Sequence, residues 1–190
     1  DPFDRLSIQD GFTYAYAPAV MMAWVTDSPN WLNQRSTSLE YRFLSSMQGS
    51  LGIGANLTHW KDEDFQAATN LIREYKNIRE TVQRGKLYRL ISPRHGSPQS
   101  ATQSVARDGR QAVLFAFLHS GTRGSPYPRV QLRGLDPDAR YRTRIVSGKV
   151  QPDTPVEASG AYWMSRGIDP EMRGDFQATA IVFDRIEAAR

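Results

Sequence analysis

The residues best suited to chemistry in this sequence are polar side chains that follow a short apolar run. Asp27, Asn30, Gln34 and Arg35 come after the run 20–25. Carboxylates can serve as general acids, bases or nucleophiles. In a β/α barrel the active site lies at the carboxyl ends of the strands, so these residues are candidates for a pocket rim. A turn capped by Asp27 and Asn30 would explain the same pattern.

Asp1 and the tryptophans are further candidates. Asp1 would lie where a strand passes into a helix, although a helix N-cap is the simpler explanation of an aspartate there. Trp31 and Trp60 fall in predicted loops, where an indole can stack on a sugar or pack in an interface. Trp24 lies inside the apolar run and is expected in the core.

Other kinds of site find little support. The sequence has no cysteine, which removes disulfides, thiolate metal sites and cysteine nucleophiles. No phosphate-binding or dinucleotide-binding glycine motif opens a helix, so no cofactor is expected. No metal site is expected either, because metal-ligand spacing is absent from the three histidines, which are His59, His95 and His119.

Charge and hydropathy indicate neither nucleic acid nor membrane as a partner. The net charge is only +4, from 24 basic and 20 acidic residues. Arg140, Arg142 and Arg144 have strand spacing without accompanying aromatics, which favours a solvated face over a nucleic-acid footprint. No apolar run approaches the length that spans a bilayer. The lack of cysteine fits a cytoplasmic location.

Residues 1–85 alternate between helical and strand patterns. Asp1 and Pro2 can open a helix, and the apolar run 20–25 is typical of a strand buried on both faces. The predicted order is a helix ending at Gly11, strand 20–25, a helix from the capping box 37–40 to Gly49, strand 51–57, and a helix from Asp62 to Gly85. This alternation predicts βα units with a parallel sheet. Two strands do not make such a sheet stable, so this half needs partners.

Residues 86–190 change to short strands separated by turns. Asp108-Gly109 is a strong hairpin signal. Strands are predicted at 86–91, 101–107, 111–119, 129–133, 141–146, 161–165 and 175–186. The pattern predicts an antiparallel β-sandwich, with a domain boundary between Gly85 and Lys86.

Several segments of the first half resemble glycoside hydrolase family 36 α-galactosidases. The stretch DPFDRLSIQDGF at 1–12 resembles the segment after that family's Ser-Asp-Asn-Thr-Asp motif. WVTDSPN at 24–30 with Arg35, TSLEYRF at 37–43 and GSLG at 49–52 follow the family in order and spacing. Trp24 departs from the pattern, because a histidine is common there.

The resemblance implies terminal βα units of a (β/α)8 barrel over 1–85 and an antiparallel β-domain over 86–190. It implies retaining hydrolysis of terminal α-galactosides such as melibiose and raffinose by two carboxylates. In that family the first aspartate of the motif is the acid/base. Asp1 matches the last aspartate, so the acid/base is expected just before Asp1, three residues upstream, and the nucleophile further upstream. The chain alone, expected to hold no catalytic residue, would be inactive.

The resemblance also bears on partners. It implies α-galactoside oligosaccharides, the remainder of a parent chain and a homo-oligomer, often a tetramer. The alternatives are a non-catalytic sugar-binding module and a structural β-domain that braces the barrel and supports oligomer contacts. A galactosyl transferase or an α-N-acetylgalactosaminidase would share these features.

Overall fold

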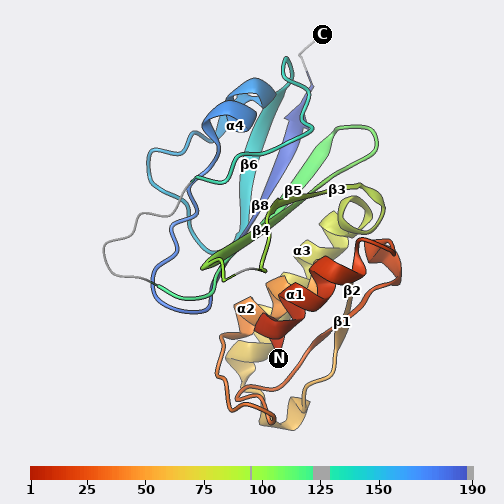
Figure 1. Cartoon of the computed structure of the whole chain (residues 1–190), viewed down its shortest axis with the longest axis vertical. Helices are drawn as coiled ribbons and strands as arrows, with labels where there is room; N and C mark the ends of the chain where they lie inside the picture. Colours follow the sequence, from red (N-terminus) through yellow and green to blue (C-terminus); the bar gives the residue numbers. More distant parts are fainter. Residues whose placement is uncertain (95, 122–128, 188–190) are drawn as a thin grey trace.

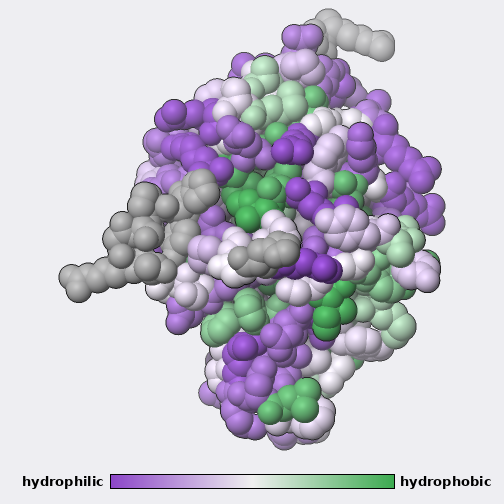
Figure 2. Space-filling view, viewed as in Figure 1, coloured by the Kyte–Doolittle hydropathy of each residue, from purple (hydrophilic) through white to green (hydrophobic). Residues whose placement is uncertain are grey.

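The computed structural model describes residues 1–94, 96–121 and 129–187, so His95 lies outside the described residues. The chain forms a helical layer with a small sheet, and a larger sheet that packs on it (Figure 1). Polar side chains cover much of the face seen in Figure 2, with apolar patches between them. None of the helices in the described ranges has the length and apolar character that a membrane crossing requires.

The first half contains the predicted alternation of helices and strands. Its elements are α1 (Pro2–Phe12), η1 (Pro18–Val20), β1 (Met22–Val25), α2 (Leu39–Ser46), β2 (Ser50–Ile53), η2 (Leu57–His59) and α3 (Asp62–Arg84). β1 and β2 are parallel, and α2 forms the crossover between them. The parallel pairing is therefore confirmed, and the described part of the chain gives this pair no third strand.

The apolar run predicted that strand β1 would be buried on both faces, but the structure buries only one face. Ala23 and Val25 are fully buried, whereas Met22 and Trp24 are 67% and 42% exposed. Trp24 is therefore not a core residue in this structure. Only one face of the small sheet packs on helices, and an apolar sequence does not reveal which faces a fold covers. Gly52 accommodates the indole, since a Cβ there would lie 2.7 Å from Trp24.

Helix and strand ends differ by a few residues from the prediction. Gly11 lies inside α1, which continues to Phe12. The N-cap of α2 is Ser38, whose Oγ accepts a hydrogen bond from Tyr41 N at 3.1 Å. The helix therefore starts one residue later than predicted, with Tyr41 in the N3 position that the predicted capping box gave to Glu40. The predicted strand 51–57 ends at Ile53, where Gly54 and η2 turn the chain away.

The second half forms one antiparallel sheet in the order β3-β4-β5-β8-β6-β7. The strands are β3 (Lys86–Ile91), β4 (Gln99–Val105), β5 (Gln111–Leu118), β6 (Arg140–Ser147), β7 (Glu157–Ser159) and β8 (Gln177–Ile186). The predicted hairpin at Asp108-Gly109 joins β4 and β5, with Gly109 at a φ of 71°. The antiparallel architecture is thus confirmed.

Two predicted strands have another structure. Residues 161–165 lie in helix α4 (Gly160–Arg166), which begins at Ser159 as N-cap and buries Trp163 completely. Their aromatic residues favour strands, but the cap and the burial of Trp163 against Phe183 determine a helix. Residues 129–133 make only an isolated bridge, between Val130 and Ile168.

Alternate side chains of the central strands enter two separate cores. Val113 and Phe115 of β5 pack with α1, α2 and α3. Leu114 of β5 and Phe183 of β8 pack with α4 and the bridged segments on the other face of the sheet, so the described residues place a helix and isolated bridges where a sandwich would have its second sheet. Figure 1 shows these helices on opposite sides of the sheet. Both halves of the chain share the first core, so the domain boundary after Gly85 stays a prediction.

Candidate functional site

Asp1 is the N-cap of α1, as the simpler interpretation of the sequence predicted. Its Oδ1 accepts hydrogen bonds from Phe3 N at 2.7 Å and Asp4 N at 3.1 Å. Only 4% of its side chain is exposed. The first turn of a helix presents unpaired N–H groups and the positive end of the dipole, so it stabilises the charged carboxylate.

The loop after β1 brings two further side chains to Asp1. Arg35 Nη1 lies 2.8 Å from Asp1 Oδ1 and 3.3 Å from Asp4 Oδ1. Asn33 Nδ2 donates to Asp1 Oδ2 at 2.9 Å. Both oxygens of Asp1 are therefore occupied. Asn33 was missed among the candidates, and the only signal for it is its place between two polar candidates in the same loop.

Asn30 and Gln34 shape this loop. Asn30 N donates to Arg35 O at 2.9 Å, and Asn30 O accepts from Gln34 N at 2.8 Å. Asn30 Oδ1 accepts from Leu32 N at 3.0 Å, and the residue is 3% exposed. Gln34 adopts a left-handed backbone with φ 57°, which tightens the turn. The structure thus makes Asn30 an internal anchor that directs Arg35 toward Asp1.

Asp27 and the loop tryptophans lie apart from that cluster of bonds. Asp27 Oδ1 accepts from Asn56 N at 2.9 Å and so ties the loop after β1 to the loop after β2. Trp31 is 78% exposed. Trp60 stacks on Phe43 and Phe65, with ring centroids 6.5 and 5.5 Å away, which favours a packing role over the sugar-stacking role.

Phe176, from the sheet half, also reaches Arg35. The guanidinium carbon lies 4.6 Å from the centroid of the Phe3 ring and 5.3 Å from that of Phe176. The two rings lie edge to face at 5.7 Å. Sequence reasoning missed Phe176, because nothing local marks a residue just before β8 as a partner of Arg35.

His119 and Tyr41 complete the apolar surroundings of Phe3 and Phe176. The His119 ring packs edge to face on Phe3 at 4.9 Å, and its nitrogens have no hydrogen-bond partner among the described residues. Burial lowers the pKa of His119 from 6.5 to about 4, so the ring is neutral at pH 7. Burial likewise raises the pKa of Tyr41, which packs on Phe176 at 6.1 Å.

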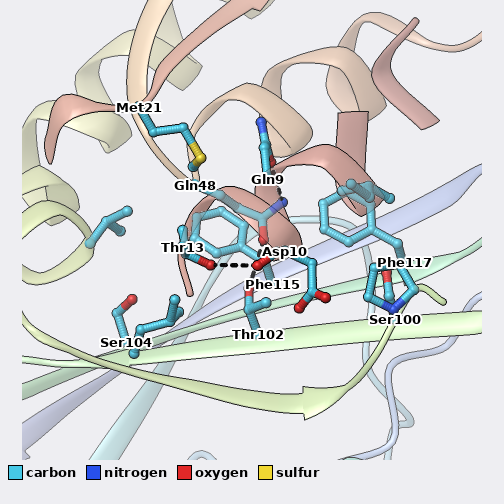
Figure 3. A pocket seen from close by; sticks show the side chains of 14 residues that line it. Gln9, Asp10, Thr13, Met21, Gln48, Ser100, Thr102, Ser104, Phe115 and Phe117 are labelled. Carbon is cyan, nitrogen blue, oxygen red and sulfur yellow. Dashed lines mark hydrogen bonds between the residues drawn. The ribbon is translucent and has the colours of Figure 1, made fainter. Parts of the chain in front are cut away.

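The other end of α1 borders a small internal cavity (Figure 3). Its volume is about 30 Å³, which suits a water molecule or two rather than a sugar. Gln48 Oε1 accepts from Thr102 Oγ1 at 2.6 Å there. Asp10 lies 3.4 Å from Arg89 Nε and 3.1 Å from Arg94 Nε. This cavity therefore belongs to the packing of α1 on the sheet.

The described residues contain no cluster of three or more His, Asp and Glu side chains that could hold a metal ion. The three arginines of β6 pair with two carboxylates. Arg142 Nε donates to Glu157 Oε1 at 2.6 Å, Arg140 lies 3.9 Å from Glu157, and Arg144 pairs with Glu74. These pairs agree with the solvated-face interpretation.

Comparison with known proteins finds two family models that match successive stretches of the chain. Residues 1–85 match the family model described as melibiase. Residues 99–183 match the model described as the glycosyl hydrolase family 36 C-terminal domain. Probable alpha-galactosidase C of Aspergillus terreus is 33% identical over 98% of this chain and 24% of its own length. Alpha-galactosidase Mel36A of Lactobacillus acidophilus is 35% identical over the same shares.

Solved structures show a similarity to the same group of enzymes. The family 36 alpha-galactosidase AgaB of Geobacillus stearothermophilus superposes with a TM-score of 0.88 at 27% identity, over 98% of this chain and 24% of that one. A variant of AgaA from the same organism, solved with raffinose, has a TM-score of 0.88 at 26% identity, over 98% and 25%. The chain thus falls in the class of glycoside hydrolases. Within that class it belongs to glycoside hydrolase family 36. It spans about a quarter of the length of the curated relatives it matches.

Proposed function

We propose that this chain is the C-terminal quarter of a retaining α-galactosidase that acts on terminal α-galactosides of the melibiose and raffinose type. The observation that carries the proposal is the match of both halves, in order, to family models of such enzymes. The relatives are named alpha-galactosidases, and solved neighbours were captured with raffinose and with stachyose. The same relatives support the proposal that the complete protein is a glycosidase.

Residues 1–85 would be the last βα units of a (β/α)8 barrel, and residues 86–190 its C-terminal β-domain. The exposed face of the small sheet supports this division. Ile8, Val20, Met22 and Leu32 are each 64–70% exposed on α1, η1, β1 and the following loop. A two-stranded parallel sheet with one apolar face open to water is unusual, because parallel sheets are covered on both faces. Neighbouring barrel strands would cover these side chains.

In this proposal the chain supports catalysis without holding either catalytic carboxylate. One carboxylate attacks the anomeric carbon, and the other protonates the leaving oxygen and then activates water. The acid/base would come just before Asp1, so Asp1 and Arg35 would fix the position from which it acts. Asp27, Trp31 and Gln34 would contribute to the pocket rim, with the exposed indole of Trp31 able to stack on an outer sugar ring.

The proposal is tested by kinetics on the complete protein. We expect hydrolysis of p-nitrophenyl α-galactoside and raffinose, with α-galactose as the first product seen by NMR because the mechanism is retaining. The 190-residue chain alone should give no turnover. Turnover by the pure chain would contradict the location of the acid/base, and release of β-galactose would contradict the mechanism.

Two further expectations remain proposals: a homo-oligomer, often a tetramer in this family, and a cytoplasmic location. Light scattering of the complete protein would measure the oligomeric state. Deleting residues 86–190 would then test whether the β-domain braces the barrel. An unchanged oligomer and an unchanged melting temperature would argue against that role.

A further inference from the structure

We propose that Phe176 is a positioning residue for acid catalysis, acting from the C-terminal sheet through Arg35 on Asp1. The inference rests on the proposed function, in which the acid/base lies three residues before Asp1. It assigns to the β-domain a part in the reaction that goes beyond bracing the barrel.

The contacts form an unbroken chain from Phe176, just before β8, to Asp1, the N-cap of α1. Phe176 and Phe3 contact the guanidinium of Arg35 at 5.3 and 4.6 Å. Arg35 in turn lies 2.8 Å from the buried carboxylate of Asp1. The rings exclude water from this ion pair, and lower local polarity strengthens it. A planar guanidinium suits this position, because it can stack on rings while its edge binds a carboxylate.

The backbone around Phe176 holds the ring against Arg35. Phe176 has a φ of 51°, a left-handed conformation that is unfavourable for a residue with a large side chain. Its N–H donates to His119 O at 3.4 Å, and the neighbouring Asp175 Oδ1 accepts from Gly121 N at 2.8 Å. Strained backbone of this kind persists where surrounding structure enforces it, and it is common at functional sites.

Losing the Phe176 ring would expose one face of Arg35 to water. The guanidinium would then exchange among Asp1, Asp4 and solvent, and the strand-to-helix junction at Asp1 would lose its fixed position. A displaced general acid slows reactions that need protonation of the leaving group. A leaving group that departs without a proton is affected far less.

The test compares two substrates of the complete enzyme, raffinose and 2,4-dinitrophenyl α-galactoside. The constant kcat/KM reports the steps through formation of the glycosyl-enzyme, where only raffinose needs the acid. For Phe176→Ala we expect kcat/KM to fall about tenfold or more on raffinose, and about threefold or less on the dinitrophenyl substrate. Phe176→Trp keeps an aromatic ring and should restore the raffinose value. Arg35→Lys keeps the charge without the planar group and should reproduce the alanine pattern.

Two controls separate this role from general destabilisation. Tyr162→Ala removes a partly buried ring from the core on the opposite face of the sheet and should leave the substrate ratio unchanged. Phe176→Leu fills the space without a ring and stands in if the alanine variant does not fold. Equal losses on both substrates, or no loss, would overturn the inference while wild-type activity upholds the proposed function. A wild-type enzyme inactive on both substrates would overturn both.

Discussion

The two ends of α1 hold aspartates that are buried to the same degree but satisfied in different ways. The side chain of Asp1 is 4% exposed and that of Asp10 is 3% exposed. Asp1 accepts hydrogen bonds from two backbone N–H groups and from Asn33, and it pairs with Arg35. Asp10 has two arginine neighbours, yet its oxygens make no hydrogen bond of good geometry within the described ranges.

The origin of the partners explains the difference. Asn33 and Arg35 come from the loop after β1, so the bonds of Asp1 organise the candidate pocket rim. Arg89 and Arg94 come from β3 and the residues after it, so Asp10 joins the helical layer to the sheet. Burial of a charge alone therefore does not identify a functional aspartate. The comparison predicts that stability depends mostly on Asp10 and activity mostly on Asp1.

The largest expected loss of stability follows Asp10→Asn. It leaves Arg89, whose side chain is 23% exposed, without its charge partner in a mostly buried site. Breaking such a pair costs about 3 kcal/mol, the low end of the range for buried pairs. Urea unfolding of the complete protein measures this loss, and activity of the folded fraction should stay near wild type.

As a control, Glu157→Gln breaks the more exposed pair with Arg142 and should cost less than about 1 kcal/mol. Equal losses of stability in the two variants would show that the buried pairs of Asp10 contribute no more than an exposed pair.

A smaller effect distinguishes the Asp1 end by its pH dependence. His119 packs on Phe3, and its pKa is about 4 when folded against 6.5 when unfolded. Between these pH values the unfolded chain binds a proton that the folded chain does not, so stability falls as the pH decreases from 6.5 to 4. Between pH 7 and pH 5 the loss should reach about 2 kcal/mol.

His119→Phe keeps an edge-to-face ring and removes the titration. Urea unfolding at pH 7, 6 and 5 should therefore show a flatter decline for the variant than for the wild type. Parallel declines would show that His119 has the same pKa in the folded and unfolded chains, and the apolar description of its surroundings would be wrong.

Local signals predicted much of the fold. The Asp1-Pro2 helix start and the Asp108-Gly109 turn depend on a few adjacent residues, and both were read correctly. Residues 161–165 were not, because the burial of Trp163 against Phe183 is a long-range contact that overrides strand propensity. The exposed face of β1 was missed for a similar reason, since hydropathy does not show what lies on each side of a strand.

The sequence likewise predicted some features of the candidate site and missed others. Asp1 and Arg35 were identified because they follow from helix capping and from position after a strand. Their pairing was not predicted, and neither was the ring of Phe176, which is far from Arg35 in the sequence and meets it only in the folded chain. The spacing of residues in the sequence identifies the polar groups of the site. The fold determines which apolar side chains pack on these groups and shield their ion pairs from water.

The smallest expected change in stability, with a large change in activity, follows Asp1→Asn. Asparagine caps helices about as well as aspartate, so the cap hydrogen bonds from Phe3 and Asp4 can persist. The variant loses one charge that holds Arg35, but Arg35 keeps the carboxylate of Asp4 at 3.3 Å, so the loss of stability should be smaller than for Asp10→Asn. Turnover of raffinose should nevertheless fall about tenfold, because the junction next to the acid/base is no longer fixed. If Asp1→Asn lowers stability more than Asp10→Asn does, the division of roles between the two ends of α1 is wrong, since it requires the buried pair with the sheet to dominate stability.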